Sequence, residues 1–154
     1  MADDVTLRPI GVVSGGRDDW HEDDWGSVEA AIVLDSEQFA PDATTGLHEF
    51  SHVEVVFLFD RVDPSRIRSE PRPARGDNRF PPVGVFAHRG PFRPNRIGVT
   101  RCRLLGVTGL HLRVQGLDAL AGSPVLDVKP CHVEFETGPI SQPSWTSQLM
   151  ADYF

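Results

Sequence analysis

The sequence predicts an all-β protein, a single closed or near-closed β-barrel with one or two short helices. Short segments rich in β-branched and aromatic residues alternate with loops that contain glycine and proline, which is typical of barrels and sandwiches. Strands and helices do not alternate regularly, and no G-x-G-x-x-G follows a strand. A doubly wound nucleotide-binding fold is therefore not expected.

Seven segments are predicted as strands from their composition and the turn residues beside them. The strongest is 52–60, where apolar residues run almost continuously, as in a strand buried on both faces. The other predicted strands are 6–13, 28–34, 83–88, 97–105, 110–117 and 125–130. A short helix fits 36–46 or the C-terminal segment SWTSQLMADYF.

The 154 residues, 40% of them hydrophobic, are enough for one core, so we expect one domain over 1–154. No apolar run approaches the roughly 20 residues of a membrane-spanning helix. The N-terminus is acidic where a signal peptide needs positive charge. We therefore expect a cytoplasmic protein. Its two cysteines show no C-x-x-C spacing, so neither a disulfide framework nor a structural zinc site is expected.

The net charge of −7 is distributed unevenly along the chain. Residues 1–60 carry 14 acids and 2 bases, residues 61–113 carry 3 acids and 12 arginines, and residues 114–154 carry 5 acids and 1 lysine. Such an arginine block can bind phosphates, because each guanidinium offers a planar fork of donors. Alternatively, the arginines pair with the acidic N-terminal third, within the chain or across a dimer.

Two proline-containing loops lie inside the arginine block. The segment 63–82 contains five prolines, and we expect a long loop that is ordered only by partners or a ligand. The second loop, 88–95, carries Arg89 and Arg93 on a turn stiffened by Pro91 and Pro94. It suits recognition of a carboxylate, a phosphate or a planar base. It also fits a structural turn with solvated arginines.

HEFSH at 48–52 matches the zinc-protease pattern H-E-x-x-H. That chemistry requires both histidines on one helical turn. Here His52 opens a predicted strand, so we expect His48 and His52 to border a loop–strand junction and predict no metal site.

The segment 116–130 places Asp118 and Asp127 on either side of a Gly-Ser-Pro turn. Asp127 and Lys129 share one face of the predicted strand. Within an apolar strand the two charges are expected to pair, either as a structural ion pair or as part of a site.

Two long stretches together resemble the signature of the TsaA-like β-barrel family. They are GVFAHRGPFRPNRIGV (84–99) and LRVQGLDALAGSPVLDVKP (112–130). The resemblance extends upstream to LRPIGVV and GLHEFSHVEVVFLFDR and covers nearly the whole chain. Departures occur at Arg96, Ala121, Ser123 and Cys131, where the family usually has proline, aspartate, threonine and an aromatic residue.

The resemblance implies a homodimeric barrel that binds S-adenosyl-L-methionine without a Rossmann domain and needs no metal. Characterised members methylate N6 of threonylcarbamoyladenosine in tRNA. Carried over by position, the cofactor contacts are Trp25, Gly26, Asp60, Arg61, Arg89, Asp118, Ala119, Leu120 and Ala121.

The resemblance also suggests how methyl transfer would proceed. Arg93 could hold the carboxylate of a threonyl acceptor through two hydrogen bonds, and Asp127 or His88 could act as the general base. Two alternatives stay open. One is the same cofactor with a small-molecule or protein acceptor, and the other is a noncatalytic S-adenosylmethionine-binding module.

Overall fold

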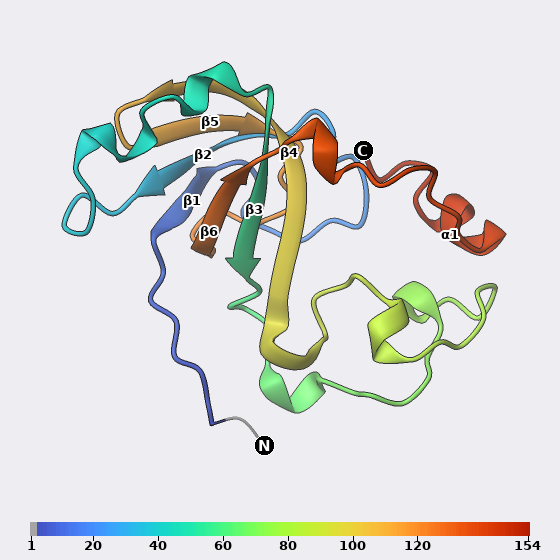
Figure 1. Ribbon diagram of the computed structural model, residues 1–154. Coiled ribbons are helices and arrows are strands. Elements are labelled where there is room, and N and C mark those ends of the chain that lie inside the picture. The colour runs from blue at the N-terminus through green and yellow to red at the C-terminus, as the bar shows by residue number, and fades with distance from the viewer. Residues whose placement is uncertain (1–2) are drawn as a thin grey trace.

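The computed structural model describes residues 3–154 and contains a closed barrel of six antiparallel strands (Figure 1). The predicted fold class is confirmed. Around the barrel the strands follow the order β1-β2-β5-β4-β3-β6, and β6 pairs with β1. The strands are β1 (Gly11–Gly15), β2 (Glu29–Leu34), β3 (His52–Leu58), β4 (Ile97–Thr108), β5 (His111–Gln115) and β6 (Pro124–Pro130).

The helices are short and lie between the strands or in the segment that follows β6. The α-helix α1 (Ser144–Leu149) confirms the helix expected in the C-terminal segment, whereas 36–46 forms only a 3₁₀ turn. None of the helices formed by residues 3–154 has the length and apolar character that crossing a membrane requires. The 3₁₀ helices are Pro41–Thr44, Leu47–Glu49, Pro64–Arg66, Ala74–Gly76, Val85–Ala87, Pro94–Arg96 and Val133–Phe135.

The core fills the barrel with alternate residues of each strand, because successive side chains of a strand point to opposite faces. On β3, Val53, Val55 and Phe57 are buried, while Glu54 and Val56 between them are only half-buried. The prediction that this strand is buried on both faces is therefore wrong. Its outer face points away from the barrel interior and is only half-buried.

A glycine on β4 allows the largest core side chain of β3 to pack closely. Gly98 lies opposite Phe57, and a Cβ atom at Gly98 would lie 2.5 Å from Cζ of that ring. The Phe57 ring also packs edge-on against Phe59, with centroids 5.1 Å apart. The β3–β4 contact is therefore shaped by the missing side chain at Gly98.

The predicted strand over 83–88 is wrong. Val83 forms an isolated bridge with Arg72, after which the chain turns into the 3₁₀ helix Val85–Ala87. The amide of Ala87 donates to Gly84 O at 2.9 Å, so this backbone is satisfied locally and needs no neighbouring strand. The first strand also starts later than predicted, at Gly11 instead of residue 6.

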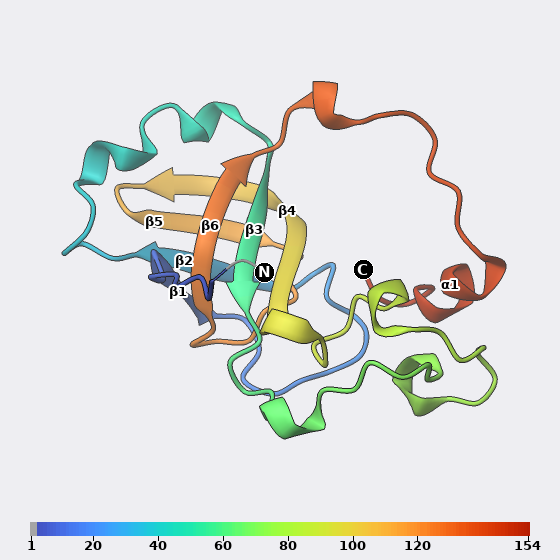
Figure 2. The ribbon, with the colours of Figure 1, turned by 60° about the horizontal axis from the view of Figure 1, so that its bottom comes forward.

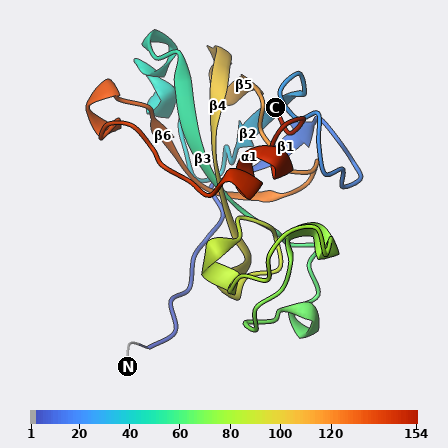
Figure 3. The ribbon, with the colours of Figure 1, turned by 90° about the vertical axis from the view of Figure 1, so that its right-hand side faces the viewer.

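The connection between β3 and β4, residues 59–96, projects away from the barrel (Figure 3). Contacts with other parts of the chain keep this connection in place. Arg75 forms ion pairs with Asp23 at 2.6 Å and Glu22 at 3.3 Å, and the Arg75 guanidinium holds the pKa of the Asp23 carboxyl below its usual value. Phe80 packs against Trp145 of α1, which lies beside the connection (Figure 2). The expectation that only a partner or ligand orders 63–82 is wrong.

The two cysteines should differ in reactivity. Cys102 is buried in the core, and burial raises the pKa of its thiol to about 12. Cys131 is half-buried, and burial raises its pKa as well. With DTNB at pH 8 we expect slow reaction of Cys131 alone in the folded protein and of both thiols in guanidinium, because the thiolate is the nucleophile. A Cys131→Ser variant that still reacted in the folded state would contradict this assignment.

Candidate functional site

The predicted cofactor residues belong to three connections at one end of the barrel. Because neighbouring strands are antiparallel, the β1–β2, β3–β4 and β5–β6 connections all lie at this end. Here β5 stops at Gln115, opposite Arg103 of β4. The first half of β4, residues 97–102, therefore extends beyond the end of β5. On the side that β5 does not cover, the backbone of β4 is open to contact by loop residues.

Asp118 is the centre of this end of the barrel. The hydroxyl of Thr100 on β4 donates to one of its carboxylate oxygens, and the hydroxyl of Tyr153 donates to the other. Burial raises the pKa of Tyr153, and the negative charge of Asp118 raises it further. Tyr153 therefore stays protonated and holds the Asp118 carboxylate in a fixed orientation.

Trp25 is held in the β1–β2 connection by Arg17 and by a hydrogen bond of its own indole. The indole of Trp25 is fully buried and donates from Nε1 to His21 O at 3.0 Å. The Arg17 guanidinium lies 4.6 Å from the centroid of the indole and donates to the carbonyl of Asp23 at 2.7 Å. This role of Arg17 could not be predicted, because nothing in the sequence distinguishes Arg17 from a solvated arginine.

Residues 152–154 run along the β1–β2 connection and complete the site. The amide of Asp24 donates to Asp152 O, and the amide of Trp25 donates to Tyr153 O, both at 2.8 Å. A Cβ atom at Gly26 would lie 2.5 Å from the carbonyl carbon of Phe154. Gly26 therefore admits the C-terminal backbone, and this backbone brings Tyr153 to Asp118. Sequence reasoning placed a helix near this segment but missed the site contact.

Arg61 joins the β1–β2 and β5–β6 connections. Its guanidinium donates to Asp18 O and, at 2.6 Å, to Ala121 O. The amide of Ala121 donates to Arg17 O at 2.8 Å. Ala121 therefore takes part through its backbone, which explains how alanine can stand where the family usually has aspartate. Asp60, the residue before Arg61, is exposed.

Arg89 lies at the free edge of β4. Its guanidinium donates to Val99 O at 2.8 Å, and its charge partly offsets the rise in the pKa of Tyr153. The positive charge of Arg89 is thus within electrostatic reach of Tyr153, which donates to Asp118. The structure therefore groups Arg89 with Asp118, Trp25 and Gly26.

The three predicted catalytic residues are not all brought together. Arg93 donates to His88 O at 2.9 Å. His88 Nε2 lies 3.1 Å from both Arg72 O and Val83 O; because carbonyl oxygens only accept, Nε2 carries the proton. Asp127 lies on β6, where it forms an exposed ion pair with Lys129 and accepts from Val128 N. Its contacts do not include His88 or Arg93.

The side chains at this end of the barrel fit S-adenosylmethionine chemically. The cofactor carries a cationic sulfonium, a carboxylate, a planar adenine and ribose hydroxyls. Asp118 and Asp60 offer negative charge, and Arg89 offers a fork for a carboxylate. Trp20 packs against Trp25 with centroids 5.6 Å apart, and the residue is 37% exposed, so it can offer an aromatic face to a cation or a base.

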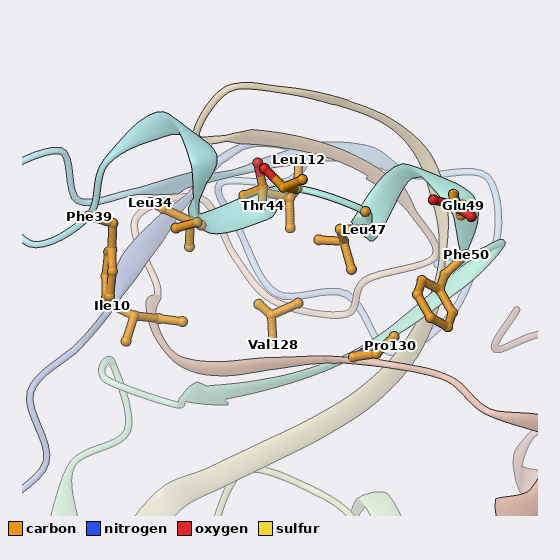
Figure 4. A pocket seen from close by; sticks show the side chains of 13 residues that line it. Ile10, Leu34, Phe39, Thr44, Leu47, Glu49, Phe50, Leu112, Val128 and Pro130 are labelled. Atoms are coloured by element: carbon orange, nitrogen blue, oxygen red, sulfur yellow. The ribbon is translucent and has the colours of Figure 1, made fainter.

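A separate cavity lies at the opposite end of the barrel. It has a volume of about 770 Å³ beneath the segment that joins β2 to β3 (Figure 4). The hydroxyl of Thr44, at its wall, donates to Gly109 O at 2.8 Å. Its lining is mainly apolar and contains none of the predicted site residues, so it is separate from the site around Asp118. Apolar lining residues include Ile10, Leu34, Phe39, Leu47, Phe50 and Val128.

The HEFSH motif does not form the geometry of a zinc protease. His48 lies in the 3₁₀ helix Leu47–Glu49, whereas His52 is the first residue of β3. The two imidazoles therefore do not share a helical turn. Across residues 3–154, no group of three or more His, Cys, Asp or Glu side chains is placed to hold a metal ion.

Comparison with known proteins gives three kinds of match. The sequence model of the tRNA-methyltransferase O N-terminal domain matches residues 23–137. A probable S-adenosyl-L-methionine-binding protein of Methanothermobacter thermautotrophicus is 36% identical over 138 residues, which are 87% of this chain and 95% of that protein. The human tRNA (adenine(37)-N6)-methyltransferase is 37% identical over 92 residues, 60% of this chain and 20% of that enzyme.

The crystal structure of TrmO from Pseudomonas aeruginosa has the same fold. It superposes with a TM-score of 0.73 at 26% identity and covers 93% of this chain. This chain spans 63% of the length of that structure. The family match, the relatives and the shared barrel confirm the resemblance found in the sequence: the chain belongs to the TrmO (TsaA-like) family, through its tRNA-methyltransferase O N-terminal domain.

Proposed function

We propose that this protein is an S-adenosylmethionine-dependent methyltransferase that acts on tRNA, with N6 of threonylcarbamoyladenosine as the acceptor. Two relatives support it, one named as an S-adenosyl-L-methionine-binding protein and one as a tRNA (adenine(37)-N6)-methyltransferase. The observation that carries the proposal is the convergence of Trp25, Gly26, Arg89 and Asp118 at one end of the barrel.

The residues at this end would bind and orient the cofactor. Arg89 binds its carboxylate, and the negative charge of Asp118 stabilises its positive charge. The backbone of the β5–β6 connection borders the site next to Asp118, at Ala119, Leu120 and Ala121. When bound, S-adenosylmethionine supplies a reactive sulfonium methyl group. Correct positioning can then account for much of the rate.

The acceptor side of the site would be formed by Arg93 and His88. Arg93 holds the threonyl carboxylate with the guanidinium donors that His88 O does not use. Of the two candidate bases, we favour His88 through Nδ1, because Nε2 faces two carbonyl oxygens. Asp127 is the weaker candidate, because Lys129 already neutralises it.

We also propose a cytoplasmic homodimer, as the family resemblance implies. Four large apolar residues are at least 75% exposed: Phe86, Val133, Phe135 and Ile140. Apolar side chains as exposed as these are typical of protein–protein interfaces. Light scattering over a dilution series should give twice the mass of the chain. The mass of a single chain at every concentration would contradict the dimer.

The cofactor proposal is tested by calorimetric titration with S-adenosylmethionine. We expect micromolar binding by the wild type and a loss of about tenfold or more in Arg89→Ala, because a charged hydrogen-bond pair is lost. Arg113→Ala is the matched control, since Arg113 is an exposed arginine that pairs with Glu29 on the barrel wall. No wild-type binding at millimolar cofactor would contradict the proposal.

A second candidate is the same cofactor chemistry on a small-molecule or protein acceptor, or cofactor binding without transfer. The relative that this chain covers almost completely is named only as an S-adenosyl-L-methionine-binding protein. Transfer of labelled methyl from the cofactor to tRNA that lacks the modification separates the candidates. Cofactor binding without tRNA methylation would favour the second.

A further inference from the structure

Arg66, Arg68, Arg72 and Phe92 line a shallow depression of about 150 Å³ in the β3–β4 connection. The depression lies next to the residues proposed to hold the acceptor. Arg72 O lies 3.1 Å from His88 Nε2, and His88 O accepts from Arg93. The depression and the proposed acceptor residues thus share one network of contacts.

The three arginines of the depression lack acidic partners. Within residues 3–154, the basic side chains that form ion pairs are Arg8, Arg75, Arg79, Arg101, Arg113 and Lys129. Asp63 is the acid closest in sequence to Arg66, but its carboxylate accepts from Ser65 N and lies more than 4 Å from the Arg66 nitrogens. Four arginines of the segment 61–113 thus pair with acids, whereas the three arginines of the depression lie together with no acid within ion-pair distance.

The cluster is held in a fixed shape by backbone carbonyls and an aromatic ring. Arg72 donates to Arg68 O at 2.8 Å and to Phe92 O at 3.0 Å, and Arg68 donates to Ile67 O at 3.0 Å. The Arg66 guanidinium lies 4.6 Å from the centroid of the Phe92 ring. These contacts orient the arginines before any ligand arrives, which lowers the entropic cost of binding.

We propose that Arg66, Arg68 and Arg72 form a binding site for the RNA backbone of the acceptor. Guanidinium forks match phosphate oxygens, and guanidinium and aromatic groups are surfaces on which an unpaired base can stack. The combination favours a phosphodiester next to a base over a simple anion. This inference rests on the proposed function, since it assumes that the methyl acceptor is an RNA.

The test measures binding of a fluorescent anticodon stem–loop RNA by anisotropy, without cofactor, from about 50 to 200 mM salt. We expect R66A/R68A to weaken binding at least about tenfold and to lower the slope of log affinity against log salt by about 1 to 2, as two lost phosphate contacts require. R66K/R68K keeps the charges but loses the forks, and should bind with intermediate affinity.

The matched control is R79A/R113A, which removes the same charge from two exposed arginines that already pair with Asp77 and Glu29. We expect RNA affinity within about twofold of wild type, because neutralised arginines add little to phosphate binding. Equal losses in R66A/R68A and R79A/R113A would overturn the proposal, since overall charge would then explain the binding. Wild-type protein that binds no RNA at low salt would also overturn it.

Cofactor titration of R66A/R68A separates this inference from the proposed function. Wild-type cofactor affinity with lost RNA binding is the expected result. If RNA binds through Arg66 and Arg68 but the wild type binds no cofactor, the proposed function fails and the RNA site stands. If anionic phospholipid vesicles bind through Arg66 and Arg68 and RNA does not, the depression recognises a membrane surface and the proposal is wrong.

Discussion

Asp118→Ala should lower the affinity for S-adenosylmethionine on the order of 10- to 100-fold. Asp118 places a negative charge at the centre of the site, held by the hydroxyls of Thr100 and Tyr153. Two opposite unit charges about 4 Å apart near a protein surface attract each other by on the order of 4 kcal/mol before the cost of desolvation, and each 1.4 kcal/mol is about a factor of ten in affinity. Calorimetric titration of the variant and the wild type measures the change directly.

Loss of structure must be separated from loss of charge in this experiment. Asp118→Ala also leaves the hydroxyls of Thr100 and Tyr153 without their acceptor, at a cost of about 1–3 kcal/mol in stability. Asp118→Asn keeps the shape and one acceptor oxygen, so it should melt near the wild type but bind the cofactor weakly. Asp42→Ala removes an exposed carboxylate at the opposite end of the barrel and should bind normally. If Asp118→Asn binds S-adenosylmethionine as tightly as the wild type, the negative charge of Asp118 has no role in cofactor binding.

Gly98→Ala should lower the free energy of unfolding by about 1–3 kcal/mol, the usual cost of overpacking a core. The added methyl would lie 2.5 Å from the Phe57 ring. That ring is only 1% exposed and packs against Phe59, so it cannot swing into solvent. For a chain of this size we expect the melting temperature to fall by about 2–4 °C per kcal/mol, which scanning calorimetry can resolve.

Gly106→Ala is the matched control for this prediction. Gly106 lies on the same strand, β4, and an added Cβ would meet nothing within 4 Å. We expect little change in its melting temperature. The double variant Gly98→Ala/Phe57→Leu should be less destabilised than the sum of its single changes, because the smaller side chain removes the clash. Strictly additive effects would show that Gly98 and Phe57 do not interact in this way.

The barrel could be predicted from the sequence because its signals are local. β-branched runs, turn residues and the alternation of apolar side chains act over a few residues, and β2 and β3 begin within a residue of their predicted starts. The predicted strand over 83–88 failed because Val83 and Val85 have strand-like composition, whereas local turn hydrogen bonds satisfy the backbone that follows. Composition alone does not reveal where an amide finds its acceptor.

The site was predictable only as a set of positions taken from the family resemblance. Its contacts connect residues far apart in the chain, such as Tyr153 with Asp118 and Arg61 with Ala121. Neither the hydrophobic periodicity nor the residue spacing of the sequence predicts these contacts. Arg17 and Tyr153 were therefore missed, and Asp127 was grouped with His88 although its ion pair with Lys129 lies on β6 itself.

The sequence by itself determined the fold class, the family and the concentration of arginine between 61 and 113. Only the tertiary structure decided which of those arginines are neutralised. Arg75 pairs with Asp23 in the acidic N-terminal third, whereas Arg66, Arg68 and Arg72 gather around Phe92 without an acid within ion-pair distance. The physical reason is that a charge is neutralised by whatever lies within a few ångströms of it, and chain folding sets that distance.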